Sequence, residues 1–309
     1  MRTLLDIIVN TFRINPFSKK LIYISEISTS KLCRVRIFDV EEEKCFEQKI
    51  LLRIITSLEG ISQINMNNCL YLCGSNDEAS NSVGSYLLKI DISISPLQPI
   101  ILINSIFSHN FPSLINYLND YLIVVGGKNQ IQCECYQLSN TKWKQLPTLP
   151  DDRYKATLFC DEQNDNIYLF GGYNSSSKCN SKTILRLNMK TCSIWEFIVV
   201  KENENFLARN SSICFMFEGT DKIFICGGKD NNDKDTEYII EYDSNKKTMK
   251  KFEKSLKRVS NFEEQGYVDL NKLHFAFFDK DNFVHTISRN SFRMSIIKFD
   301  DFCQISSSP

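Results

Sequence analysis

Short apolar segments alternate with polar turns along most of the chain, and four of the apolar segments share one design. Three of them end in a pair of glycines: Tyr121–Gly127, Ile167–Gly172 and Ile223–Gly228. A fourth, Leu70–Gly74, has Cys73 in place of the first glycine. Strands with one wet face alternate apolar and polar residues, whereas strands covered on both faces do not. The pattern therefore predicts four strands that are buried between sheets.

Each of these segments has the same neighbours in the sequence. A turn rich in Asn, Asp or Gly precedes it, and a short strand-like segment, such as Ala156–Cys160 or Ser212–Phe217, precedes the turn. A variable polar loop, a third strand, a second turn and a fourth strand follow. The predicted third strands are Ser85–Ile90, Cys133–Leu138, Thr183–Leu187 and Tyr238–Tyr242. Because such turn residues suit hairpins, we predict that each unit is a four-stranded antiparallel meander.

The second glycines of the four units give the period of the repeat. They stand at positions 74, 127, 172 and 228, so the successive gaps are 53, 45 and 56. The mean gap is about 51, and the chain length of 309 divided by this gap gives about six units, a period typical of β-propellers. Arg153 and Arg209 each stand 18 positions before the first glycine of their unit, Gly171 and Gly227. The equal spacing supports a repeated structural element.

These residues resemble the kelch repeat family. The best stretch contains Tyr136, Trp143 and Arg153 and ends in Ile167–Gly172. In kelch repeats a Tyr and a Trp at this spacing, a Gly-Gly pair and an Arg mark one blade. After Tyr242 the Trp is replaced by Met249 or Phe252. The resemblance implies structural roles for Gly74, Gly126, Gly127, Gly171, Gly172, Gly227, Gly228, Tyr136, Trp143, Trp195 and Tyr242.

The resemblance predicts an all-β fold, a single kelch-type β-propeller domain over residues 1–309 with six four-stranded blades. The approximate blade limits are 1–55, 56–104, 105–148, 149–202, 203–256 and 257–309. The first and last blades lack Gly-Gly pairs and are inferred from strand pattern, so five or seven blades or a truncated ring stay open. Their predicted strands are Leu21–Ser25, Cys33–Val40, Phe46–Leu51, Leu273–Phe278, Phe283–Ser288 and Phe292–Phe299.

Closing the ring gives the apolar segment Leu4–Val9 two possible places. Kelch propellers usually complete one blade with strands from both termini. We therefore expect Leu4–Val9 either to pair with the blade between Gly266 and Phe299 or to form the first strand of the first blade.

Charge and composition exclude some functions. The chain has 37 Lys and Arg against 37 Asp and Glu, a formal net charge of +0, which excludes a strongly basic phosphate-tracking surface as its main feature. No apolar run approaches the roughly 18 residues that span a membrane. Met1–Asn10 is interrupted by Asp6 without a following cleavage site, so we expect no secretory signal and a cytoplasmic location.

The 12 cysteines are expected to be reduced thiols. Two pairs, Cys69 with Cys73 and Cys133 with Cys135, could suggest a metal site. Neither pair has the C-x2-C spacing of a zinc site, and neither is followed by a second pair of ligands at matching spacing. On a strand, Cys133 and Cys135 would share one face. We predict structural roles for them, no metal site and no cofactor.

A binding module is the first of three functional classes, since fold alone does not give function. Loops vary without disturbing a core, so they carry recognition. Candidate segments are Ser75–Ser82, Lys128–Ile131, Tyr173–Ser181, Lys229–Thr236, Ser105–Phe111, Pro150–Arg153 and Asn203–Asn210. Candidate residues are Arg153, Arg209, Lys128, Tyr173 and Lys229. In some resembling proteins arginines on this kind of surface bind acidic peptides through bidentate hydrogen bonds. The alternative is that both arginines bond a neighbouring blade's backbone.

An enzyme of galactose-oxidase or sialidase shape is the second class. Copper chemistry needs imidazoles, and the chain has only His109, His274 and His285, of which His274 lies in an apolar run typical of a core. A sialidase-like site needs an arginine cluster, a nucleophilic Tyr and paired carboxylates, and no segment groups these. We therefore predict that the chain is not an enzyme.

Binding to an anionic surface is the third class. Lys246–Arg258 holds seven basic residues against one acidic residue, Glu253. The alternative is that lysines on an exposed outermost strand discourage unwanted strand pairing. The sequence favours a non-enzymatic protein-protein interaction module, a scaffold or substrate receptor with an unidentified protein partner. We expect no membrane contact and no nucleic acid, and the oligomeric state stays open.

Overall fold

The computed structural model describes most of the chain between residues 20 and 298. The described ranges are 20–27, 32–39, 44–52, 60–66, 68–74, 84–94, 96–200, 208–216, 221–234, 236, 238–255, 267–269, 274–278, 283–288 and 294–298. Strands and turns account for the regular structure in these ranges. Across them, no helix has the length and apolar character that crossing a membrane requires.

The strands form five four-stranded antiparallel sheets, one three-stranded sheet and one two-stranded hairpin. The three-stranded sheet contains β1 (Lys20–Ile27), β2 (Leu32–Asp39) and β3 (Lys44–Leu51). The next two contain β4 (Ile61–Met66), β5 (Cys69–Gly74), β6 (Tyr86–Asp91) and β7 (Pro99–Ile101), then β8 (Ser113–Tyr117), β9 (Tyr121–Gly127), β10 (Gln130–Gln137) and β11 (Lys142–Leu146).

The remaining strands continue the same order. One sheet contains β12 (Thr157–Asp161), β13 (Asn166–Phe170), β16 (Ile184–Asn188) and β17 (Glu196–Ile198), with the hairpin β14 (Tyr173–Asn174) and β15 (Cys179–Asn180) inserted after β13. The last two contain β18 (Ile213–Met216), β19 (Lys222–Cys226), β20 (Tyr238–Asp243) and β21 (Thr248–Ser255), then β22 (Tyr267–Asp269), β23 (His274–Phe278), β24 (Phe283–Ser288) and β25 (Met294–Lys298).

The predicted all-β class and the four-stranded antiparallel units are confirmed. The segments Tyr121–Gly127 and Phe283–Ser288 agree with β9 and β24 at both limits. One loop differs: Tyr173–Ser181 was predicted as a polar loop, and it contains the short hairpin β14–β15. Asn174 Oδ1 accepts a hydrogen bond from Ser177 N–H at 2.7 Å, and Lys178 has a φ of 53°, which together turn the chain back on itself.

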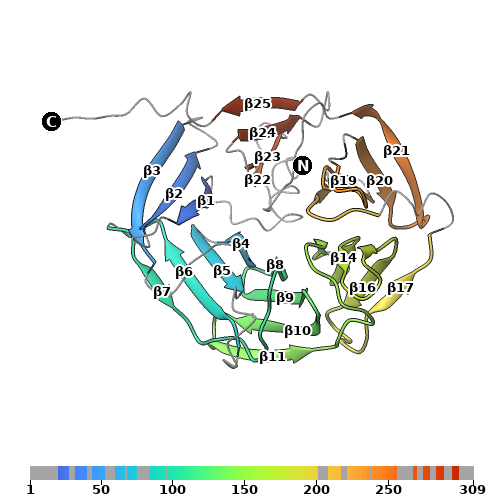
Figure 1. Cartoon of the computed structure of the whole chain (residues 1–309), viewed down its shortest axis with the longest axis horizontal. Helices are drawn as coiled ribbons and strands as arrows, with labels where there is room; N and C mark the ends of the chain where they lie inside the picture. The colour runs from blue at the N-terminus through green and yellow to red at the C-terminus, as the bar shows by residue number, and fades with distance from the viewer. Residues whose placement is uncertain are drawn as a thin grey trace, which may run out of the picture.

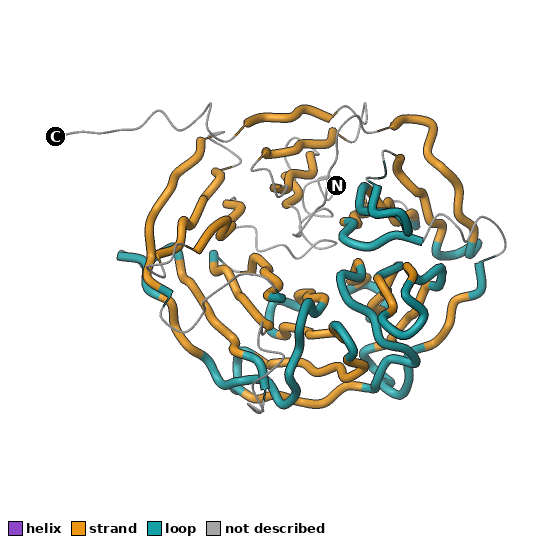
Figure 2. Tube along the Cα trace, in the orientation of Figure 1, coloured by secondary structure: helices purple, strands orange, loops and turns teal. Residues whose placement is uncertain are grey.

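The sheets follow one another around a common centre (Figures 1 and 2). In each of these views the early strands of a sheet, such as β4 and β8, lie toward the centre, while the last strands, such as β7 and β11, lie at the periphery. Chain order therefore sets the distance of a strand from the centre.

A row of backbone hydrogen bonds connects the first strands of consecutive sheets. Phe111 N–H donates to Gly60 O at 2.8 Å, Lys155 N–H to Phe111 O at 3.4 Å, and Ser211 N–H to Lys155 O at 2.8 Å. All four residues lie just before a first strand, and all have positive φ values, from 52° at Ser211 to 79° at Gly60. Left-handed backbone is costly for residues other than glycine, so its recurrence at one position indicates that the junction between sheets requires it.

Hydroxyl groups add a second row beside the first. Ser62 Oγ donates to Pro112 O at 2.5 Å, Ser113 Oγ to Ala156 O at 2.8 Å, and Thr157 Oγ1 to Ser212 O at 2.9 Å. Each bond joins the first strand of one sheet to the chain that enters the next sheet. These bonds fix the distance between neighbouring sheets near the centre.

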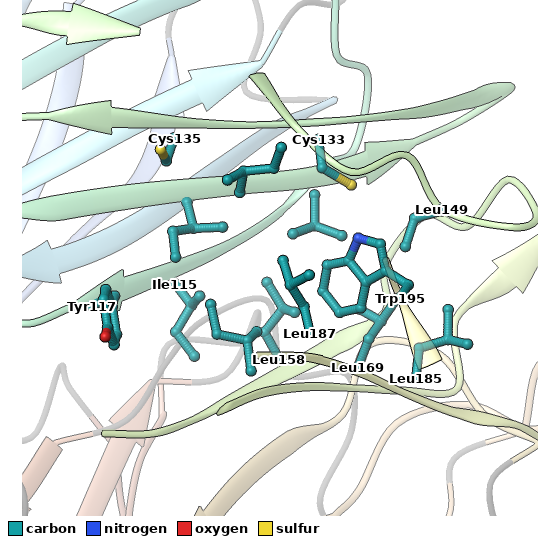
Figure 3. Packing of buried hydrophobic residues seen from close by; sticks show 14 residues of the cluster. Ile115, Tyr117, Cys133, Cys135, Leu149, Leu158, Leu169, Leu185, Leu187 and Trp195 are labelled. Carbon is teal, nitrogen blue, oxygen red and sulfur yellow. The ribbon is translucent and has the colours of Figure 1, made fainter. Parts of the chain in front are cut away.

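Apolar side chains fill the space between facing sheets. Figure 3 shows one such cluster, in which Cys133 of β10 and Leu149 of the linker after β11 face Leu169 and Leu187 of the next sheet. Trp195, just before β17, belongs to the same cluster. The middle strands β5, β9 and β13 carry buried residues at nearly every position, as expected for strands covered on both faces.

The glycine pairs lie at the ends of β9, β13 and β19. The linker that leads into the first strand of the same sheet crosses the chain there, and this crossing requires glycine. The second glycines, Gly127 and Gly228, have φ values of 143° and 84°, and a Cβ atom there would lie 2.8 Å from Asn110 O and 2.4 Å from Asn210 O, respectively. Gly74 follows the same rule, because a Cβ atom there would lie 2.4 Å from Gly60 O. A side chain at these positions is excluded by backbone conformation and by space together.

At the periphery, an aromatic pair marks the third and fourth strands. Tyr136 pairs with Trp143 across β10 and β11, and their ring centroids are 5.1 Å apart. Met249 takes the place of the Trp beside Tyr242, because β20 and β21 pair in the same register. Trp143 and Trp195 also bind the preceding sheet, since their indole N–H groups donate to carbonyls of its outgoing linker, Ile103 O at 2.8 Å and Pro147 O at 3.0 Å.

The two ends of the described structure differ in strand number. The first sheet has three strands, whereas the last sheet has four of its own, β22 to β25. The segment Leu4–Val9, which the sequence assigns to one of these two sheets, lies outside the described residues.

Candidate interaction surface

Three of the candidate residues occupy one equivalent position in consecutive sheets. Lys128, Tyr173 and Lys229 each follow a Gly-Gly pair directly. Their backbones bond to the linker that enters the first strand: Lys128 N–H to Asn110 O at 2.7 Å, Tyr173 N–H to Tyr154 O at 3.0 Å, and Lys229 N–H to Asn210 O at 2.9 Å. We call this end of the sheets the glycine end, and the opposite end, where Ser139 and Asn188 lie, the turn end.

An aromatic cluster spans two neighbouring sheets at the glycine end. The rings of Phe111 and Tyr154 are 5.9 Å apart and those of Tyr154 and Tyr173 are 5.3 Å apart. Lys155 Nζ lies 4.7 Å from the Phe111 ring centroid. All four side chains are partly exposed. Burial raises the pKa of the Tyr154 hydroxyl, so this group is neutral at physiological pH and can both donate and accept a hydrogen bond.

Hydrogen bonds inside the loops hold the glycine end in a defined shape. Asp152 accepts from Ser175 N–H at 2.9 Å and from Ser176 Oγ at 3.1 Å. Burial alone would raise the pKa of Asp152, but the hydrogen bonds from Ser175 and Ser176 outweigh burial and lower it. An ionised carboxylate therefore ties the β14–β15 hairpin to the linker that precedes Arg153.

Asn180 connects the loops of two neighbouring sheets. Its side-chain amide donates to Lys229 O at 3.1 Å and its Oδ1 accepts from Asn210 Nδ2 at 2.9 Å. Its backbone N–H donates to Asn231 Oδ1 at 2.6 Å. The variable loops are therefore joined to one another, and what they display is pre-organised.

Arg153 and Arg209 do not belong to the exposed part of this surface, because both are 1% exposed. Arg153 Nη1 donates to Gly171 O at 3.4 Å and Arg209 Nη1 to Gly227 O at 2.9 Å. The guanidinium of Arg153 also forms two hydrogen bonds with the Asp151 carboxylate, at 2.6 and 3.1 Å. The geometry corresponds to the structural alternative for both arginines, although the bonded carbonyls belong to their own sheet rather than to a neighbouring one.

A buried histidine occupies the corresponding position in the preceding sheet, and the repeat pattern did not mark it. His109 Nδ1 lies 2.7 Å from Gly126 O, and Nε2 lies 2.8 Å from Glu134 Oε1. Both side chains are fully buried. Because a carbonyl oxygen can only accept, Nδ1 carries a hydrogen. His109 stands two positions before Phe111 as Arg153 stands two before Lys155, and this offset was the available signal.

Glu134 also binds the linker between two sheets. Its carboxylate accepts from Ile106 N–H at 2.8 Å and from Phe107 N–H at 3.3 Å. Ser85 and Ser105 continue this buried polar network, since Ser85 Oγ donates to His109 O at 3.0 Å and Ser105 Oγ to Phe107 O at 2.7 Å. Ser105–Phe111 was a candidate recognition segment, and most of its polar groups bond instead to Ser85, Gly126 and Glu134 in the interior.

Two lysines of the lysine-rich segment lie beside carboxylates, and a third, Lys251, lies with its Nζ 4.8 Å from the Tyr238 ring centroid. Lys250 Nζ lies 3.5 Å from Glu241 Oε1, which also binds Lys222 Nζ at 2.7 Å, and Lys246 Nζ lies 3.8 Å from Asp243 Oδ2. The side chains of Lys254, Lys257 and Arg258 lie outside the described residues.

The cysteine pairs are buried in apolar clusters. Cys133 and Cys135 lie in one cluster, as expected for residues that share a strand face, and Cys69 and Cys73 lie in another. Burial raises the pKa of the Cys133 thiol to about 12 and that of Cys135 to about 11, so both remain protonated thiols at physiological pH. Among the described residues, no group of three or more His, Cys, Asp or Glu side chains is arranged to hold a metal ion.

Comparisons with known proteins do not identify this surface: no protein-family model matches the chain, and no curated protein matches it.

Proposed function

We propose that this chain is a kelch-type β-propeller of six blades and that it acts as a non-enzymatic protein-interaction module. Support for the architecture comes from the arrangement of successive sheets around one centre (Figure 1) and from the repeated bonds between first strands. We assign one blade to each of the six larger sheets of the described residues. In this proposal the three-stranded first blade accepts a further strand, because the last blade already has four.

The equivalence of Lys128, Tyr173 and Lys229 is the observation that carries the functional proposal. Three consecutive blades place Lys, Tyr and Lys side chains at one position, on a backbone fixed by the same hydrogen bonds. A rigid scaffold with variable loops at one end is how many folds present recognition residues. The scaffold thus supplies the position, and each loop supplies its own chemistry.

The side chains at the glycine end suit a protein partner. Tyrosine and phenylalanine offer large contact areas at a low cost in conformational entropy, while Ser and Asn offer adaptable hydrogen bonds. The Phe111, Tyr154 and Tyr173 rings are already packed together, so they lose little freedom when a partner covers them. The exposed Lys128 and the partly exposed Lys155 add positive charge beside these rings, which favours a partner with acidic side chains.

A quantitative capture experiment from the source cells tests the proposal. We expect at least one protein that the wild type enriches and that the Lys128→Glu and Tyr173→Ser variants lose. The matched variant Lys190→Glu changes another exposed lysine, at the turn end. It should retain the same protein. Thermal melting of each variant verifies that it is folded. If every captured protein is recovered equally by all folded variants, the glycine end is not the recognition surface.

A further inference from the structure

The outermost strand β7 is an unusual edge, because it and its continuation are apolar and exposed. Among the described strands, β7 is the last in its sheet. Ile100, Ile101 and Ile103 are 43%, 58% and 58% exposed. No Asp, Glu, Lys or Arg occurs between positions 92 and 119. A hydrophobic edge strand without charge is a template for pairing with another strand.

Other outermost strands carry charged side chains, which β7 lacks. β21 carries Lys250 and Lys251, β11 carries Lys142 and Lys144, and β17 carries Glu196 beside its exposed Phe197. Charged side chains, lysine above all, keep exposed edges apart. The absence of any charged side chain therefore sets β7 apart from these three strands.

The register of β6 and β7 determines which backbone groups face outward. Leu88 pairs with Ile101 and Lys89 with Ile100, and Leu102 N–H donates to Leu87 O at 2.8 Å. In an antiparallel ladder, hydrogen-bonded and non-hydrogen-bonded pairs alternate. The pair Leu87–Leu102 is hydrogen-bonded, so Ile101 is in a non-hydrogen-bonded pair and its N–H and C=O point to the outer edge.

The outward groups around Ile101 are self-complementary. Two positions away on either side, Pro99 offers an outward C=O but no N–H, and Ile103 offers an outward N–H while its C=O accepts from Trp143 Nε1 at 2.8 Å. If β7 pairs with a second β7 in antiparallel direction about Ile101, Ile101 bonds to Ile101 of the other copy twice. The Ile103 N–H of each copy then donates to Pro99 O of the other copy. Pro99 has no N–H to donate in return, but the Ile103 O opposite it already accepts from Trp143 Nε1.

We propose that the β7 edge, residues 99–103, is a site of self-association, and that its occupant is the β7 edge of a second copy of this chain. The pairing joins two four-stranded sheets into one continuous sheet and places Ile101 against Ile101 and Ile103 against Pro99. Because neither edge carries charge, the symmetric pairing meets no like-charge repulsion. The contact is small beside the roughly 1600 Å² that a typical stable interface buries, so the association is weak and reversible.

Sedimentation velocity over a range of protein concentrations tests this proposal. The average mass of the wild type should rise from 35.9 kDa toward twice that value as the concentration approaches about 1 mM. Ile101→Pro removes the outward N–H without removing a bond to β6, and Ile103→Lys puts a charged side chain against Pro99 of the other copy in each direction. Each should weaken association at least about tenfold, since every symmetric pairing loses two contacts.

The control is Ile194→Lys, which changes another exposed isoleucine, 63% exposed, far from β7 in sequence, and should associate as the wild type does. The exchange of backbone amide hydrogens in the peptide spanning residues 99–103 provides a second measurement and should slow as the wild-type concentration rises. If Ile101→Pro does not fold, Ile101→Lys replaces it. A wild type that stays at 35.9 kDa at all concentrations, or an association that Ile101→Pro and Ile103→Lys leave intact, overturns the proposal.

Discussion

The sheet β8–β11 and the two sheets that follow it meet the same structural requirement with different side chains. In the later sheets a buried arginine donates to the carbonyl of the first glycine, Gly171 O or Gly227 O. In β8–β11 the donor to Gly126 O is His109. An arginine is long enough to reach on to the third strand, as Arg209 does to Tyr238 O at 3.5 Å. The imidazole is shorter, and Glu134 on the third strand reaches back to meet it.

These two arrangements show that the fold requires a buried donor beside the first glycine rather than an arginine. The glycine has a left-handed conformation in all three sheets, with φ values of 59° to 63° at Gly126, Gly171 and Gly227. Its carbonyl is turned into the interior, where an unpaired acceptor is costly. The two solutions differ in electrostatic character, because the histidine sheet buries a carboxylate, whereas the carbonyls that Arg209 binds are neutral.

Substituting the second glycines should have the largest effect and should be equal in both kinds of sheet. Gly127→Ala and Gly228→Ala each force a side chain into left-handed backbone and against a carbonyl less than 3 Å away. We expect each to lower the free energy of unfolding by more than about 3 kcal/mol, measured by urea denaturation. Lys128→Ala, next to Gly127 and exposed, is the control and should change little. A much smaller loss at Gly127 would show that the two sheets are not equivalent.

His109→Leu should cost more than the corresponding change of an arginine. Leucine has a similar volume but leaves the Glu134 carboxylate buried without its histidine, a loss of about 3 kcal/mol in the free energy of unfolding. Adding Glu134→Gln removes the buried charge and should recover part of that loss. Denaturation of the single and double variants gives the coupling energy. Strict additivity would mean that the two residues do not act as a pair.

Arg209→Met should cost about 1 to 2 kcal/mol in the free energy of unfolding. Its removal leaves neutral acceptors, Gly227 O and Tyr238 O, rather than a buried carboxylate, and methionine fills much of the space. Denaturant titration of this variant beside His109→Leu measures the difference between the two sheets directly. If Arg209→Met is less stable than His109→Leu, the buried carboxylate does not explain the difference between the two sheets.

Asp152→Asn should have the smallest effect, and the effect should depend on pH. The pKa of Asp152 in the folded protein lies below its ordinary value, so its stabilisation is complete above the unfolded pKa of about 3.9 and is lost as the pH falls through the folded pKa. We expect the variant to be about 1 kcal/mol less stable at pH 7 and the difference to shrink below pH 4. Unfolding at pH 7, 4 and 3 measures this. A difference that stays constant with pH would contradict the role of the ionised carboxylate.

Much of the sheet structure could be predicted because its determinants are local. Apolar runs and turn residues located β9 and β24 at both limits. For the place beside Tyr242 the sequence left Met249 and Phe252 as alternatives, and the register places Met249 there. The histidine site could not be predicted in the same way. His109 stands 17 positions before Gly126 rather than 18, and its partner Glu134 stands 25 positions after it. A His and a Glu at that separation have no local signature.

Sequence alone set where the chain extends, where it turns and where it can tolerate only glycine, because these depend on the conformational preferences of neighbouring residues. The pairing of buried polar groups was settled only in three dimensions. The hydroxyl bonds between consecutive sheets join residues 43 to 55 positions apart, and this separation changes with every loop length. Packing of one sheet against the next, rather than any fixed spacing, brings those partners within bonding distance.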